Sequence, residues 1–381
     1  MQKIIIKKKS ENIDRHRNVT FSCLEAIAII MVIDDHTGRH IDILSNVFPY
    51  NSFYMPLFVF ISGYFYKKTI YVKNIKSKIM HLFVPYMICA LIGNAIAYLL
   101  DKCNIVHWYE NINGKNLLQW ITICPPSTTS AGWFAIMLVW VSISYSIIQE
   151  IINVKNKWFD YLELLILVGI GMSAVYFCME GYSFNLKYLP WLRMLFYLQF
   201  YHFGIVFKKY WEIYIKKMST CLLCGICIFI NLLLIYFYGY DINFSASCWM
   251  ANFNSYYLPV ITSLTGILFW YKIMHEFSEN WGGGGFSTIN FFAKNTFWIM
   301  ESHLFFINIP SFYTWYKKVF QGITYSSFDQ KLFESSPWMG SNGSIVAFFT
   351  GVIGSAIFVC IIRFGQKKVR LLSNKYLNNI V

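Results

Sequence analysis

Residues 20–40 read TFSCLEAIAIIMVIDDHTGRH, an apolar run in which Glu25 is the only charged side chain before the acidic pair Asp34–Asp35. Its length matches the roughly 20 residues that an α-helix needs to cross the hydrocarbon core of a bilayer. The run lacks the alternation of apolar and polar residues that marks a lipid-facing barrel strand. The stretch therefore predicts a membrane-spanning helix.

Apolar runs of similar length recur along the 381-residue chain, which is 56% hydrophobic and only 13% charged, with a mean hydropathy of +0.45. Soluble proteins carry about 25% charged residues, so the composition excludes a soluble enzyme, a disordered chain and a small disulfide scaffold. We predict an all-α, polytopic membrane helical bundle of about ten transmembrane helices. The predicted spans are residues 20–40, 52–66, 79–100, 133–152, 162–179, 189–207, 219–239, 256–274, 288–309 and 344–364.

Lysine and arginine residues are concentrated on one side of this predicted bundle. With a cytoplasmic N-terminus, 24 of the 32 basic residues lie in inner segments and 8 lie in outer segments. The positive-inside rule then predicts that both termini are cytoplasmic, and it accounts for the net charge of +13 without nucleic-acid binding. The predicted organisation is a basic N-tail (1–19), a transmembrane domain (20–364) and a basic C-tail (365–381).

Ionisable side chains inside the first span are candidate functional groups, because charges are costly in a membrane. Glu25 and His36 are 11 residues apart, which puts them on one face of the helix, about 16 Å apart along its axis. Asp35 precedes His36 and supplies a carboxylate that can fix the tautomer of the ring or raise its basicity. The alternative is that residues 34–40 form only an exposed cap at the outer end of the helix.

Ionisable residues also occur in later spans. His303 lies with Glu301 in the middle of the ninth span, where it is either a functional group or a satisfied packing residue. Arg193 opens the sixth span, and we expect its side chain to snorkel toward the membrane interface. Two small-residue segments have structural interpretations: Ser62-Gly63 predicts close helix packing, and the run Gly282–Gly285 predicts a flexible linker.

The cysteines predict no metal site. A zinc site needs about four ligands, and an apolar helix offers only three cysteines at three-residue spacing: Cys221, Cys224 and Cys227. Three other cysteines fall near the predicted outer face, where an oxidising compartment can pair two of them. These are Cys103, Cys124 and Cys248, and the sequence does not say which two would pair.

Several segments resemble, in order along nearly the whole chain, those of one known family. They are Leu24–His36, Met55–Tyr66, Gly132–Met137, Phe196–Gly204 and Ala293–His303. Together these segments are similar to the acyltransferase-3 family of integral membrane O-acyltransferases. The branch that they resemble is the one of fucose 4-O-acetylase-like proteins and surface polysaccharide O-acetyltransferases.

The resemblance implies a multi-pass enzyme of the cell (inner) membrane, surrounded by membrane lipids and binding no nucleic acid. It implies transfer of an acetyl or other acyl group from cytoplasmic acyl-CoA, chiefly acetyl-CoA, with no tightly bound cofactor. The acceptor is a hydroxyl of a cell-surface glycan, such as an O-antigen or capsule, or of an undecaprenyl-linked saccharide. The first-span histidine of the family corresponds to His36, and many members carry arginine at the position of Glu25.

Residue roles follow from this chemistry. His36, with Asp35 beside it, is the expected general base or a transient acetyl carrier, and Glu25 and His303 are further catalytic candidates. Four lysines are expected to bind the phosphates of CoA, or alternatively to attract anionic lipid: Lys67, Lys68, Lys208 and Lys209.

Two other functions compete with acyl transfer. One is a transporter or flippase of a lipid-linked glycan that uses the buried ionisable residues as a proton path. The other is a non-catalytic scaffold of a glycan-assembly complex.

Overall fold

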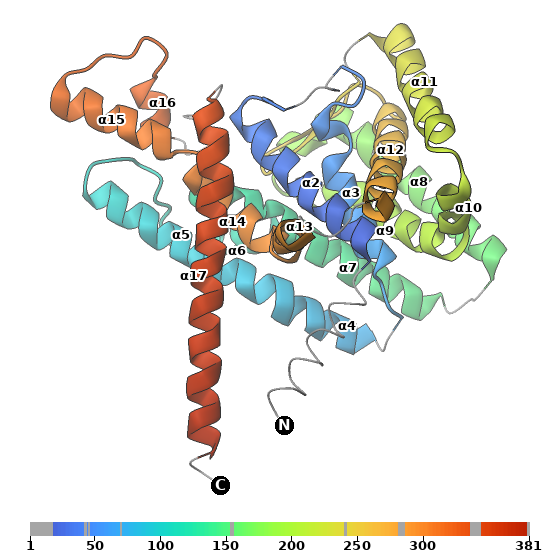
Figure 1. Ribbon diagram of the computed structural model, residues 1–381, viewed down its shortest axis with the longest axis horizontal. Helices are drawn as coiled ribbons and strands as arrows, with labels where there is room; N and C mark the ends of the chain where they lie inside the picture. The colour runs from blue at the N-terminus through green and yellow to red at the C-terminus, as the bar shows by residue number, and fades with distance from the viewer. Residues whose placement is uncertain are drawn as a thin grey trace.

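The computed structural model describes residues 18–41, 44, 46–68, 71–152, 156–239, 242–280, 286–335 and 344–378. These residues form a helical bundle (Figure 1), and their only strands are the short antiparallel pair β1 (Ser245–Ala246) and β2 (Ala251–Asn252). The predicted linker Gly282–Gly285 lies outside the described residues, as does the N-tail up to residue 17.

Every predicted span falls on a helix. Nine spans correspond to one principal helix each: α2 (Val19–Thr37), α3 (Tyr54–Tyr64), α5 (Val84–Lys102), α7 (Trp133–Ile151), α8 (Lys157–Met179), α9 (Leu189–Val206), α11 (Thr220–Tyr238), α12 (Leu258–Asn280) and α17 (Ile345–Asn378). Shorter helices connect them: α4 (Tyr71–Lys78), α6 (Gly114–Thr122), α10 (Glu212–Lys217), α15 (Ile309–Gln321) and α16 (Gln330–Ser335).

The ninth span was expected to be one helix, and this expectation is wrong. The chain forms α13 (Phe286–Lys294) and α14 (Thr296–Phe306), separated by Asn295. Asn295 leaves the helical conformation, with φ −126° and ψ 13°, and its side-chain amide donates to the carbonyl of Phe291 at 2.5 Å. Asparagine competes in this way with the helical hydrogen bonds of its own backbone, which ends α13 about two turns before Glu301 and His303 of α14.

Five stretches of the described chain are long and apolar enough to cross a membrane: Val72–Lys102, Gly114–Ile151, Lys157–Met179, Thr220–Tyr238 and Ile345–Lys368. α3 and α14 have 11 residues each, fewer than the roughly 20 that a full crossing requires. The structure therefore supports a membrane helical bundle, and the number of about ten spans and the cytoplasmic termini stay predictions.

Two glycines bring α3 and α9 into direct backbone contact. A Cβ atom added to Gly63 would lie 1.8 Å from the carbonyl oxygen of Tyr201, and one added to Gly204 would lie 2.2 Å from that of Phe60. Because no larger side chain fits at either position, glycine is required here. The close packing predicted for Ser62-Gly63 is confirmed.

The segment after α5 and the segment of α15 and α16 form a small apolar core of their own. Trp108, from the loop after α5, is buried against Phe333 of α16, and its indole nitrogen donates to the Phe333 carbonyl at 3.0 Å. The His107 amide donates to the Glu334 carbonyl at 2.8 Å. These contacts tie together segments that are far apart in the sequence.

Candidate active site

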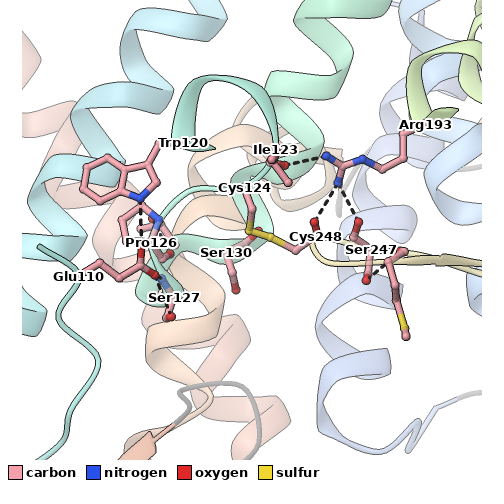
Figure 2. Close-up of a disulfide and its surroundings, with 12 residues drawn as sticks. Glu110, Trp120, Ile123, Cys124, Pro126, Ser127, Ser130, Arg193, Ser247 and Cys248 are labelled. Atoms are coloured by element: carbon pink, nitrogen blue, oxygen red, sulfur yellow. Dashed lines mark hydrogen bonds between the residues drawn. A yellow bond between two sulfur atoms is a disulfide. The ribbon is translucent and has the colours of Figure 1, made fainter. Parts of the chain in front are cut away.

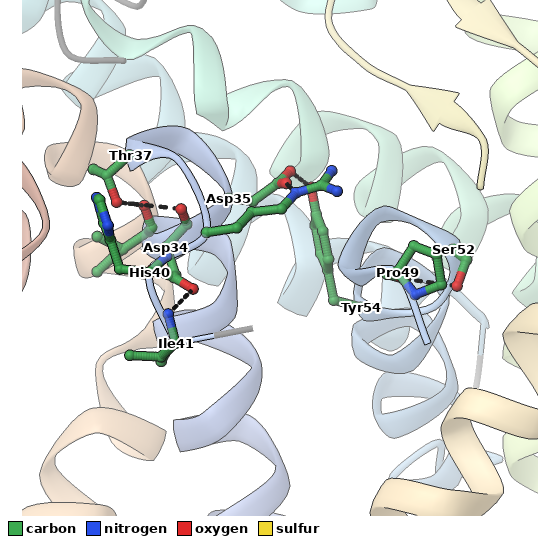
Figure 3. Close-up of polar contacts among 10 residues, drawn as sticks. Asp34, Asp35, Thr37, His40, Ile41, Pro49, Ser52 and Tyr54 are labelled. Atoms are coloured by element: carbon green, nitrogen blue, oxygen red, sulfur yellow. Dashed lines mark hydrogen bonds and ion pairs between the residues drawn. The ribbon is translucent and has the colours of Figure 1, made fainter. Parts of the chain in front are cut away.

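The end of α2 is shaped by the carboxylate of Asp34, which is fully buried. Gly38, with φ 110°, ends the helix and turns the chain back. The Asp34 carboxylate then accepts the backbone N–H groups of His40 at 2.8 Å and Ile41 at 3.1 Å (Figure 3). Asp34 therefore has a structural role in this turn, as in the alternative interpretation of residues 34–40 as a helix cap.

The Asp35 carboxylate lies between the turn and α3. One carboxylate oxygen accepts a hydrogen bond from the guanidinium of Arg39 at 2.7 Å, and the other accepts one from the Tyr54 hydroxyl at 3.0 Å (Figure 3). Both oxygens are thus engaged by α3 and by the turn. Among the described residues, Asp35 accepts no hydrogen bond from the ring of His36, the contact by which it was expected to fix the tautomer of that ring.

The structure brings together two histidines that are remote in the sequence. The ring centroids of His36 on α2 and His303 on α14 are 5.3 Å apart. His303 is fully buried, and its Nδ1 donates to the carbonyls of Met300 at 2.8 Å and Ile299 at 3.2 Å. Because carbonyls only accept hydrogen bonds, the Nε2 atom of neutral His303 carries the lone pair. This Nε2 is buried and has no hydrogen-bond partner among the described residues.

Glu301 lies on the same helix as His303 and is 3% exposed. Neither of its carboxyl oxygens has a hydrogen-bond partner within the described part of the chain. Both face Gly132, where an added Cβ would lie 2.7 Å from each oxygen. A buried carboxyl group without partners costs free energy, so this group marks a place where a proton or a ligand is expected.

Arg193 was expected to snorkel, and this expectation is wrong, because its side chain is 2% exposed. Its guanidinium donates to the carbonyls of Ser247 and Ile123, each at 2.7 Å (Figure 2). It also lies 5.0 Å from the ring centre of Trp133. Backbone carbonyls from two loops thus replace the water that snorkelling would have provided. Arg193 thus connects the two loops, on the side of Trp133.

A disulfide crosslinks the same two loops. Cys124 and Cys248 are bonded, with Cα atoms 5.4 Å apart (Figure 2), whereas Cys103 is a free, exposed thiol. Of the pairings that the sequence left open, the structure selects the one beside Arg193. The disulfide fixes the segment that leads into α7 and carries Gly132.

Glu25 lies toward the opposite end of α2 from His36, beside two cavities. The larger, of about 320 Å³, is also lined by Ser62, Lys67, Asn74 and Lys78. The smaller, of about 130 Å³, shares Glu25 and Ser62 with it and extends to Thr296 and Met300 of α14. The cavities thus lead from two lysines toward the helix that carries His303.

Four lysines were predicted to bind CoA, and three of them bond to other groups of the protein: Lys68, Lys208 and Lys209. Lys68 donates to the Gln149 carbonyl at 3.3 Å and Lys208 to the Tyr64 carbonyl at 3.0 Å. Lys209 forms an ion pair with Asp160 at 2.8 Å. Burial and a hydrogen bond to the same carboxylate raise the pKa of Tyr210 to about 12. Lys67 lines the larger cavity beside Glu25, whereas Lys68, Lys208 and Lys209 line neither of the two cavities.

Sequence reasoning missed several groups of the site. Tyr54 and Arg39 hold Asp35, and the Tyr197 hydroxyl is buried without a partner among the described residues. Tyr197 packs near Trp133, at 6.5 Å between ring centroids. Tyrosines are too numerous in this chain, at 27, for any one of them to stand out by composition.

Two histidines with ring centroids 5.3 Å apart, on α2 and α14 of a membrane helical bundle, fit the class of multi-pass membrane acyltransferases. Comparison with protein families agrees, since residues 18–368 match the model of an acyltransferase domain, that of acyltransferase-3. The chain belongs to the acyltransferase-3 family. No curated protein matches the chain, and no solved structure matches it.

Proposed function

We propose that this protein is an O-acetyltransferase that moves an acetyl group from cytoplasmic acetyl-CoA to a hydroxyl of a cell-surface or lipid-linked glycan. The observation that carries the proposal is the facing pair His36 and His303, in which the buried Nε2 of His303 is free to accept a proton. Acyl transfer to an alcohol requires such a base.

The reaction needs one proton transfer in each direction. The base takes the proton of the acceptor hydroxyl, whose oxygen attacks the thioester carbonyl carbon. The tetrahedral intermediate then collapses, the carbon–sulfur bond breaks, and the CoA thiolate leaves and takes up the proton. Donors that face the developing oxyanion accelerate this step, and the unpartnered hydroxyl of Tyr197 is a candidate donor.

The cavities beside Glu25 favour a donor site at the cytoplasmic end of the bundle. Lys67 and Lys78 supply positive charge for phosphates, and they line the same cavity as Glu25, which stands where many members of the family carry arginine. The disulfide lies at the other end of the bundle, which is consistent with an oxidising compartment there. Donor and acceptor would thus approach from opposite sides.

The donor site predicts a specific kinetic effect of Lys67. Lys67→Gln should raise the KM for acetyl-CoA about three- to tenfold and change kcat less, because the lost charge contributes to binding and not to the chemical step. Steady-state assays on the full-length protein in membranes would measure both constants. The matched control is Lys76→Gln, since Lys76 is an exposed lysine of α4 that lines neither cavity. Equal KM values for the two variants would contradict the assignment of Lys67.

Mass spectrometry of surface glycans tests the proposed function as a whole. A deletion strain should lose the mass of one acetyl group from each modified repeat, and the intact gene should restore it. A transporter would instead leave unexported glycan precursors in the deletion strain. If the protein were only a scaffold, a strain that carries the His36→Ala variant in place of the natural protein would show normal acetylation. Unchanged glycans in the deletion strain would refute acetyl transfer.

A further inference from the structure

A groove of about 410 Å³ lies between α6 and the start of α9, away from the cavities beside Glu25. One side is a face of α6, and the other is the first turns of α9 with the turn residue Lys187 just before it. Each side supplies residues with the spacing i, i+3, i+4 and i+7, which places residues on one face where the chain is helical. The first set is Lys115, Leu118, Gln119 and Thr122, and the second is Lys187, Pro190, Trp191 and Met194.

The walls of the groove are apolar and open to the surroundings. Leu118 is 62% exposed and Trp191 is 57% exposed, so both side chains lie on the outer surface of the bundle. Trp140 of α7 completes the wall. Tryptophan is enriched where a membrane meets water. A concave apolar surface lined by tryptophan therefore fits a hydrocarbon chain of a lipid.

The loop end of the groove is basic. Lys115 and Lys187 are each the first residue of their set, and both are exposed. By the predicted topology only 8 of the 32 basic residues lie on the outer side, yet two of these line this one groove. Positive charge at the mouth of an apolar groove complements an anionic headgroup on a long chain.

The floor of the groove adjoins the active site. Ile123, which lines the floor, accepts a hydrogen bond from Arg193 at 2.7 Å, and Met194 follows Arg193 in α9. The Arg193 guanidinium lies over Trp133, the neighbour of Gly132 that faces Glu301. Arg193 and Trp133 thus lie between the groove and Gly132, which contacts Glu301 of the active site.

We propose that this groove binds the lipid phosphate that carries the acceptor saccharide. The hydrocarbon chain lies against Trp140 and Trp191, and the phosphate lies between Lys115 and Lys187. The saccharide then reaches the histidine pair from the outer end of the bundle. The role of the saccharide as acceptor rests on the proposed function, whereas the lipid site itself does not.

Native mass spectrometry of the full-length protein in detergent tests this site, with undecaprenyl phosphate as the probe and phosphatidylglycerol as the competing anionic lipid. The natural protein should retain one undecaprenyl phosphate in preference to phosphatidylglycerol. The variant Lys115→Glu/Lys187→Glu should bind the probe at least about tenfold more weakly, because two attractions become repulsions. Trp191→Ala, at an exposed position, should also weaken binding.

The control variant is Lys318→Glu/Lys331→Glu, which makes the same change of charge at predicted outer lysines that do not line the groove. Equal retention of the two lipids, or equal weakening by the control variant, would overturn the proposal in favour of non-specific lipid attraction. The assay requires no turnover. Probe binding without acetyl transfer would refute only the proposed function, and acetyl transfer without probe binding would refute only this site.

Discussion

His36→Ala should lower acetyl transfer by about 10²–10⁴-fold if the imidazole acts as a general base, and should abolish it if the ring carries the acetyl group. The variant should still insert and accumulate, because the ring of His36 is only partly buried. Acetylation per unit of protein, measured by glycan mass spectrometry and immunoblotting, checks this result. His40→Ala is the matched control: its ring is exposed, and its bond to Asp34 uses only the backbone.

The same measurement on His303→Ala tests how much each of the two rings contributes to catalysis. Since the rings face each other at 5.3 Å, each single variant should lose most activity, and the double variant should lose little more, as for residues that act in one step. A His303→Ala variant without activity beside a fully active His36→Ala variant would show that His303 is the base and that His36 is not needed.

Arg193→Met should lower the free energy of unfolding by about 2–6 kcal/mol. Removing the guanidinium leaves the carbonyls of Ile123 and Ser247 buried without their donor, and each such group costs about 1–3 kcal/mol. Thermal unfolding in detergent, under non-reducing conditions so that the disulfide stays intact, would measure the loss.

Arg193→Lys should recover only part of this stability, because one ammonium group lacks the planar fork that reaches both loops. Lys331→Met, which removes an exposed cation, should leave the unfolding temperature nearly unchanged. A stability loss for Lys331→Met equal to that for Arg193→Met would contradict the structural role assigned to Arg193.

The helices could be predicted from the sequence because apolar runs are local signals, as for residues 20–40, where α2 was found. The break at Asn295 was missed because it depends on one side chain bonding to its own helix. The burial of Arg193 was missed for a different reason. Its partners are backbone carbonyls of two distant loops, and no pattern in the sequence marks them.

The candidate site was predicted only in part. His36 and His303 were each identified as ionisable residues in apolar runs, but their proximity arises from the packing of α14 against α2. The pairing of Cys124 with Cys248 likewise depends on how the loops pack. Lys67 could be recognised as basic, whereas its place in a cavity with Glu25 required the path of the chain between α3 and α4.

The glycine contact between α3 and α9 has a consequence for the alignment of residues at a distance. Gly63 is nine residues from Tyr54 on α3, and Gly204 is seven from Tyr197 on α9, which corresponds to about 14 Å and about 10 Å along the two axes. Since the backbones touch at the glycines, neither helix can slide without the other. A single added methyl group there would shift Tyr54 relative to Tyr197, so the positions of these two tyrosines depend on a backbone contact two to three helical turns away from them.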